Sequence, residues 1–159
     1  MDEPFRAGHA ERRASFVLAL PAHAAFELFT PEGEKEWAEG WDPEYLHPRD
    51  GRLGEGMVFR TAIGGEETVW SVARCEPGAS VEYVRCTHAS RIALVSVRCT
   101  PLAGERCEVT VGYAFTGLSD AGNERIREMD EARYAEFIGS WRSAIEAMLE
   151  RRAAPSAPQ

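Results

Sequence analysis

The stretch 119-SDAGNERIREMDEARYAEFIGSWRSAIEAMLERR-152 decides the fold predicted for this chain. Ser119 or Asp120 can cap a helix here, and a helical pattern continues to about Arg152. A helix over 121–152 would be about 48 Å long at 1.5 Å per residue. One broad apolar face runs along it. Its members are Ile126, Met129, Phe137, Trp141, Ile145 and Met148.

Strand patterns separated by turn signals precede this helix. Gly64-Gly65 and Pro77-Gly78 mark two of the turns. The expected strands are ASFVLAL (14–20), GMVFRTAI (56–63), ETVWSVARC (67–75), SVEYVRCT (80–87), RIALVSVRCT (91–100) and RCEVTVGYAFTGL (106–118). The last five form an antiparallel meander, and the first supplies a sixth strand.

Two short helices are expected directly after the first strand. Ala22, Ala25, Phe26 and Phe29 follow Pro21 at helical spacing, which predicts a helix over 21–29. Thr30 can cap a second helix in PEGEKEWA (31–38). One long helix cannot cover six strands by lying flat, so the sheet must curl around it while the short helices close one end. The sequence therefore predicts an interior cavity.

The segment 34–51 carries an unusual density of aromatic side chains for a loop: Trp37, Trp41 and Tyr45, together with His47. We expect it at the cavity rim, with a turn at Trp41-Asp42-Pro43 that holds one aromatic ring over the opening. Two interpretations stay open, namely packing against the fold and direct contact with a ligand. His47 could carry a proton at neutral pH, or it could be a solvated loop histidine.

The first half of the long helix places Asp130, Arg133 and Tyr134 in or beside its apolar face. Polar groups that face inward need partners, water or a ligand. Asp130 and Tyr134, four residues apart, are candidates for an acid–base pair in which burial raises the pKa of the carboxyl. The alternative is that this half of the helix protrudes into solvent.

Alternation along the strands predicts which side chains face the long helix. The inward sets are Met57 and Phe59, Trp70 and Val72, and Val109, Val111 and Tyr113. Trp70 and Tyr113 are the strongest candidates for lining the cavity, because each combines an apolar body with a polar tip. A register error of one residue would reverse any of these sets.

Composition limits the function classes. The 159 residues, 44% hydrophobic and 28% charged, suit one globular domain, and a formal charge of -8 disfavours nucleic-acid binding. No apolar run is long enough to cross a bilayer, and the first residues lack an apolar core, which favours a cytoplasmic location. Four cysteines fall singly, without metal-ligand spacing, so we expect neither a metal nor a cofactor. Arginine outnumbers the single lysine, Lys35, which is a weak indication of a GC-rich bacterial genome.

The layout resembles the helix-grip fold of the SRPBCC superfamily. It is most similar to small bacterial members related to the polyketide cyclases and the heat-shock ATPase activator homologues. The resemblance covers about residues 14–150. The stretches that carry it are FTPEGEKEW (29–37), GWDPEYLHP (40–48), GMVF (56–59), TVWSV (68–72) and GLSDAGN (117–123). It implies an α+β fold with a deep apolar pocket between sheet and helix, which in START and birch-pollen-allergen-like members holds hydrophobic molecules.

Three functions are expected in order. The first is non-catalytic binding of a small hydrophobic molecule such as a lipid or polyketide. The second is a cyclase- or dehydratase-like enzyme that works without a metal, and the third is a protein-interaction module. The ligand contacts expected are Trp37, Trp41, Tyr45, Met57, Phe59, Trp70, Tyr113, Met129, Arg133, Phe137 and Trp141. We also expect a flexible arm over 1–13, one domain over 14–152, a disordered tail over 153–159, and a monomer or homodimer.

Overall fold

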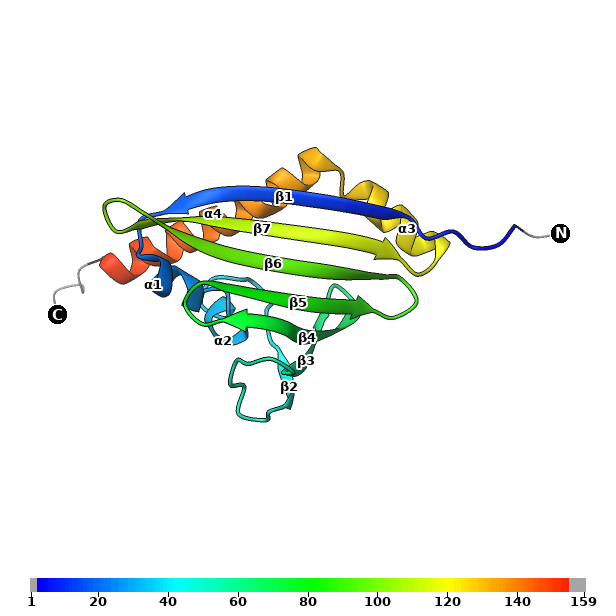
Figure 1. Cartoon of the computed structure of the whole chain (residues 1–159), viewed down its shortest axis with the longest axis horizontal. Coiled ribbons are helices and arrows are strands. Elements are labelled where there is room, and N and C mark those ends of the chain that lie inside the picture. The colour runs from blue at the N-terminus through cyan, green and yellow to red at the C-terminus, as the bar shows by residue number, and fades with distance from the viewer. Residues whose placement is uncertain (1–2, 155–159) are drawn as a thin grey trace.

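A computed structural model describes residues 3–154, and these residues form seven strands and four helices (Figure 1). The strands are β1 (His9–Leu18), β2 (Glu44–His47), β3 (Val58–Ile63), β4 (Glu66–Glu76), β5 (Ser80–Thr87), β6 (Arg91–Leu102) and β7 (Arg106–Gly117). The helices are α1 (Ala22–Glu27), α2 (Pro31–Glu34), α3 (Asp120–Glu128) and α4 (Glu131–Ala153).

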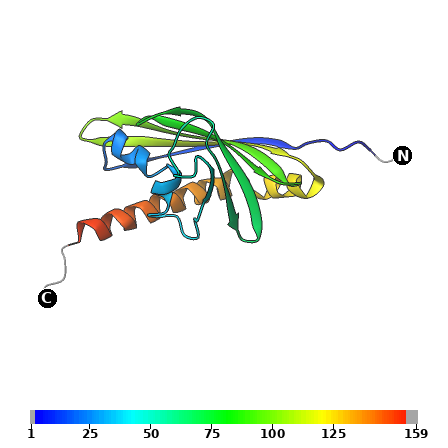
Figure 2. The same ribbon diagram turned by 90° about the horizontal axis from the view of Figure 1, so that it is seen from below.

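The strands form a single antiparallel sheet in the order β1-β7-β6-β5-β4-β3-β2. The meander runs from β2 to β7, and the first strand closes it by pairing with the last. The sheet curves over α4, with α1 and α2 near one end and α3 at the other (Figure 2). The predicted α+β helix-grip architecture is therefore confirmed.

The core lies between the concave face of the sheet and the helices. Alternate strand residues face it, because successive side chains of a strand point to opposite sides. All seven side chains predicted to face inward are buried: Met57, Phe59, Trp70, Val72, Val109, Val111 and Tyr113. From α4, Ile138, Ile145 and Met148 pack against this layer.

Part of the segment expected as an N-terminal arm belongs to strand β1. Strand β1 starts at His9, five residues before the expected Ala14, and pairs with β7 along its whole length. Before it, the Asn123 side chain accepts a hydrogen bond from the Gly8 amide at 2.7 Å and donates one to the Arg6 carbonyl at 2.9 Å. Of the expected flexible arm over 1–13, residues 1–2 lie outside the described residues. Residues 155–159 of the expected tail over 153–159 also lie outside the described residues.

The aromatic segment contains one strand that was not predicted. Residues Glu44–His47 form β2, which pairs with β3 and gives a seventh strand where about six were expected. Helix α2 ends at Glu34 and continues in turns, so it is shorter than the expected 31–38. Its predicted cap is confirmed, since the Thr30 hydroxyl accepts a hydrogen bond from the Gly33 amide at 3.0 Å.

The expected single long helix is wrong in one respect, because it breaks at Met129-Asp130. Met129 leaves the helical conformation at ψ 63°, and Asp130 is extended at ψ 178°. The Arg12 side chain donates a hydrogen bond to the freed Met129 carbonyl at 3.2 Å. Asp130 then caps the new helix, its carboxylate accepting from the Arg133 amide at 2.9 Å. Contact with β1 and a fresh cap thus compensate for the lost helical turn.

Among the described residues, none of the helices is both long and apolar enough to span a membrane.

Candidate functional site

A cavity of about 550 Å³ lies between the concave face of the sheet, α4 and the segment that begins with α2. Eight of its twenty lining residues are aromatic. Seven of the sequence-predicted ligand contacts line it: Trp37, Trp41, Phe59, Trp70, Tyr113, Phe137 and Trp141. Its volume falls within the range of 300–1,000 Å³ typical of small-molecule pockets.

The aromatic rings form two connected groups around the cavity. Phe59 and Trp70 stack with ring centroids 5.6 Å apart, and Trp41 meets Trp70 edge-on at 5.5 Å. On the helix side, Trp37 lies 5.6 Å from Trp141, which meets Phe137 edge-on. Offset and edge-on contacts are the favoured arrangements of aromatic pairs. The walls are thus held in place by each other before any ligand enters.

Three indole N–H groups of the cavity are already used within the protein. Trp37 donates to the Leu28 carbonyl at 2.8 Å, and Trp41 donates to the Pro31 carbonyl at the same distance. Trp70 donates to the Thr61 hydroxyl at 3.0 Å. Because these donors are satisfied internally, the three rings offer a ligand only their apolar surfaces.

Three glutamates line this cavity: Glu34, Glu39 and Glu66. Glu34, the last residue of α2, lines the cavity, and burial raises the pKa of its carboxyl well above the ordinary value. The attraction of Arg85 opposes that shift without cancelling it. Burial disfavours the charged form of an acid, so this carboxyl holds its proton at pH values where an exposed glutamate would lose it.

Arg85 brings a positive charge into the same space. Strand register places it between Trp70 on β4 and Ala93 on β6, and its guanidinium carbon lies 4.6 Å from the centroid of the Trp70 ring. A cation stacked in this way is stabilised by the electrons of the ring. Burial raises the pKa of the nearby Tyr113 phenol, and Arg85 again opposes the shift.

A second hollow of about 320 Å³ adjoins the first near α3 and the start of α4. It shares Arg85, Tyr113 and Phe137 with the main cavity. Met129 and Arg133, two further sequence-predicted contacts, line this hollow and not the larger one. We call the larger space the aromatic cavity and the smaller one the arginine hollow.

The fold around these spaces matches solved structures. A hypothetical protein from Helicobacter pylori aligns at TM-score 0.71 and 11% identity, over 87% of this chain and 86% of that one. Norcoclaurine synthase from Thalictrum flavum, a point mutant with a transition-state analogue, aligns at TM-score 0.66 and 11% identity over 94% and 99%. ZhuI aromatase/cyclase from Streptomyces sp. R1128 aligns at TM-score 0.64 and 20% identity over 97% and 100%.

This chain has the helix-grip fold. A scan of protein-family models finds no match, and a search of curated proteins finds no significant relative. The similarity therefore concerns the fold alone, and the chemistry of the site depends on the residues of this chain.

Some predicted residues lie outside both spaces of the helix-grip core. Met57 is buried in the core without lining either space. Tyr45 is half-buried, and its hydroxyl donates to the Glu32 carboxylate at 2.7 Å on the outer side of α2. His47 is exposed at the end of β2. The expected turn at Trp41-Asp42-Pro43 does not form, and the hydrogen bond of Trp41 to Pro31 holds the ring instead.

The acid–base pair expected from Asp130 and Tyr134 does not form. Asp130 is exposed and engaged as the cap of α4, because the helix breaks at this point. Tyr134 is buried, but its hydroxyl donates to the Val111 carbonyl at 2.7 Å and lines neither space. The two side chains therefore act in different surroundings, one in solvent and one against β7.

Sequence reasoning missed the four charged residues that line the aromatic cavity, which are Glu34, Glu39, Glu66 and Arg85. The signal for Arg85 was present but ambiguous, because SVEYVRCT carries apolar residues on both faces of the strand. In α2, both Glu32 and Glu34 are acidic, and nothing local distinguishes them. Glu32 turns outward to Tyr45 and Lys35, which leaves Glu34 as the inward carboxyl.

Proposed function

We propose that this protein binds a small, largely apolar molecule in the aromatic cavity. The observation that carries the proposal is the cavity wall, where aromatic rings are fixed by one another and by internal hydrogen bonds of their indole groups. Binding of an apolar ligand would bury the apolar surface of these rings, which is favourable, and rings that are already fixed lose little conformational entropy when the ligand binds.

The helix-grip neighbours support the same class of ligand. One neighbouring structure is described as norcoclaurine synthase in complex with dopamine and hydroxybenzaldehyde, and another as an aromatase/cyclase. Both descriptions involve small cyclic or aromatic molecules. At 10% and 20% identity they guide the choice of probes only.

Two experiments test binding. Native mass spectrometry of the purified protein, followed by organic extraction, would reveal a stoichiometric apolar passenger. Tryptophan fluorescence would follow titration with a neutral aromatic probe, 2-naphthaleneacetamide, because Trp37, Trp41, Trp70 and Trp141 all line the cavity.

A matched pair of variants locates the binding. Ala144 on α4 lines the cavity, whereas Ala147 is exposed on the same helix. Ala144→Phe would fill part of the space and weaken binding of the probe at least tenfold, and Ala147→Phe would leave binding unchanged. Equal affinity in both variants would place the probe elsewhere on the protein, and the absence of binding by wild type would contradict the proposal.

A second candidate function is acid–base catalysis on the bound molecule, and the position of Glu34 favours it. In its protonated form this carboxyl can give its proton to a leaving hydroxyl group, which departs as water while the adjacent carbon loses a proton to solvent and a double bond forms. In its ionised form it can take a proton from a carbon beside a carbonyl. In the latter case the Arg85 guanidinium would stabilise the enolate oxygen. If an extracted passenger is converted by wild type, Glu34→Gln should still bind it and fail to convert it. Conversion by the variant at the wild-type rate would remove Glu34 from this role.

A further inference from the structure

The arginine hollow gathers an excess of positive charge in a protein of formal charge -8. Four arginines from four elements line it: Arg85 on β5, Arg91 on β6, Arg125 on α3 and Arg133 on α4. Facing them are two carboxylates, Glu128 in the lining and Glu66 paired with two of the guanidinium groups. The cluster therefore carries a formal charge of +2.

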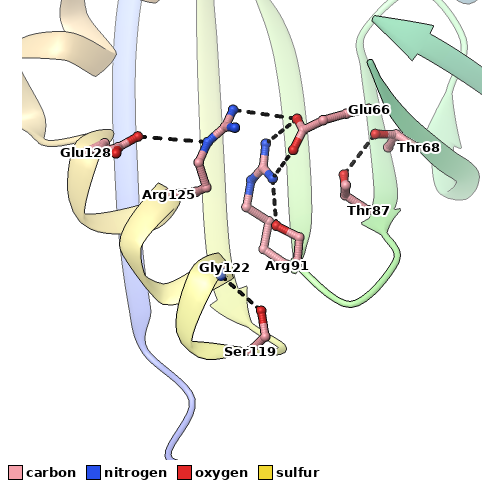
Figure 3. Close-up of polar contacts among 9 residues, drawn as sticks. Glu66, Thr68, Thr87, Arg91, Ser119, Gly122, Arg125 and Glu128 are labelled. Atoms are coloured by element: carbon pink, nitrogen blue, oxygen red, sulfur yellow. Dashed lines mark hydrogen bonds and ion pairs between the residues drawn. The ribbon is translucent and has the colours of Figure 1, made fainter. Parts of the chain in front are cut away.

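Glu66 holds two of these arginines in fixed positions (Figure 3). Its carboxylate pairs with Arg91 through two hydrogen bonds of 3.1 and 3.2 Å, and Arg125 approaches the same group at 3.5 Å. The side chain of Arg91 is only 14% exposed. Hydrogen bonds from Arg91 lower the pKa of Glu66, so the bridge stays intact at neutral pH. This bridge braces β4, β6 and α3 around the hollow.

The other two guanidinium groups have no such partner. Within the described part of the chain, neither Arg85 nor Arg133 has a carboxylate oxygen within 4.0 Å. Arg85 is half-buried over the Trp70 ring, where it faces both spaces, and Arg133 is exposed at the start of α4. A half-buried charge without a counterion is costly unless an anion or water joins it.

We propose that the arginine hollow binds the anionic end of an amphipathic ligand, a carboxylate or a phosphate monoester, whose apolar body occupies the aromatic cavity. The inference rests on the proposed function and specifies its ligand class. Arg85 stands where the two spaces meet, and with Arg133 it supplies the free donors. Planar guanidinium groups match the oxygens of both kinds of anion. Glu34, which lines the aromatic cavity and not the hollow, would face the apolar body.

Three probes with one naphthalene ring separate charge from shape. 2-Naphthaleneacetamide is neutral, 2-naphthaleneacetate is its anionic counterpart, and 2-naphthyl phosphate carries the alternative anion. We expect wild type to bind the carboxylate about 10- to 100-fold more tightly than the amide, the range given by a charge-assisted hydrogen bond. The anionic probe that binds more tightly shows whether the hollow prefers a carboxylate or a phosphate monoester.

Variants show where the preference arises. Arg85→Gln and Arg133→Gln should each reduce severalfold the ratio of the affinity for the anion to the affinity for the amide. Arg98→Gln removes the same charge from the exposed face of β6 and serves as the matched control. Arg91 is left intact, because its bridge to Glu66 supports the fold.

The outcomes are distinct. Loss of preference in Arg85→Gln and Arg133→Gln, but not in Arg98→Gln, supports the hollow as the anion site. Equal affinity of wild type for acid and amide would overturn the anion site and leave the apolar cavity standing. An equal loss in Arg98→Gln would show general electrostatic attraction and also overturn it. Failure of all three probes to bind would remove the proposed function together with this inference.

Discussion

Replacing Glu34 by glutamine should stabilise the protein, and by an amount that grows with pH. The carboxyl faces the aromatic cavity, and burial raises its pKa well above 4.5. In the unfolded chain the same group ionises near its ordinary value. Between these two pKa values the folded protein binds the extra proton, so the stability of wild type falls as pH rises through that window. The glutamine side chain does not ionise in this range, so the variant does not lose stability in this way as pH rises.

The size of the effect follows from the titration of a single group. Across the window, the difference in free energy of unfolding between variant and wild type should grow by up to about 1.4 kcal/mol for each pH unit. Well below pH 4.5 the Glu34 carboxyl is protonated in both the folded and the unfolded state, so the difference should be small and constant. Above the folded pKa it should reach a plateau. The height of the plateau measures how strongly the cavity disfavours the charge after the opposing attraction of Arg85.

Urea denaturation at steps from pH 4 to pH 8, followed by tryptophan fluorescence, would measure this difference. The protein should first be refolded from denaturant so that it carries no passenger. Glu39→Gln is the matched control, because Glu39 is exposed at the edge of the same cavity and loses the same charge. A flat profile for Glu34→Gln, or a slope equal to that of Glu39→Gln, would refute the assignment of Glu34 as a buried, protonated carboxyl.

Two further predictions concern the structure that supports the site. Gly33→Ala should destabilise the protein and weaken binding of the naphthalene probes, because its new Cβ would overlap the Glu27 carbonyl and force α2 away from α1. Gly139→Ala, in open space on α4, should instead stabilise the protein by about 0.5–1 kcal/mol. Similar changes in stability for Gly33→Ala and Gly139→Ala would contradict the predicted clash with the Glu27 carbonyl. Asp130→Ala should cost about 1 kcal/mol through the lost cap, and Tyr134→Phe about 1–3 kcal/mol through the lost bond to Val111. Both should leave probe affinity unchanged in titrations at fixed pH, and a selective loss of affinity in either would restore the acid–base pair.

The comparison of expected and observed site residues has a consistent physical pattern. Residues identified by their aromatic character were placed well, since a large ring in a strand or helix must be covered wherever the chain provides cover. Trp70 and Tyr113 line the aromatic cavity as predicted. The positions of charged residues were harder to predict. A charged side chain can face solvent or a partner inside the protein, and the neighbouring sequence does little to distinguish these two positions. For Asp130 the sequence left an inward and a solvent-exposed position open, and the structure exposes it, whereas Glu34 was not singled out and lines the cavity.

The sequence by itself determined the order of elements, the meander, the cap at Thr30 and the inward face of most strands. These features depend on spacing within a few residues, and periods of 2 and 3.6 are visible in a single chain. The strand His9–Leu18 began earlier than expected, and the strand Glu44–His47 was missed, because both carry many charged or exposed residues and gain their strand character from the neighbours with which they pair.

Only the tertiary structure decided the chemistry of the site. The break at Met129 depends on a hydrogen bond from Arg12, which lies 117 residues away in the sequence. The meeting of Arg85, Arg91, Arg125 and Arg133 depends on the register of two strands and on the position of α3 over the sheet. Long-range packing brings these charges together and fixes how well water can screen them. The raised pKa of Glu34, the lowered pKa of Glu66 and the positive charge of the hollow therefore arise from the assembled fold and from no local stretch of sequence.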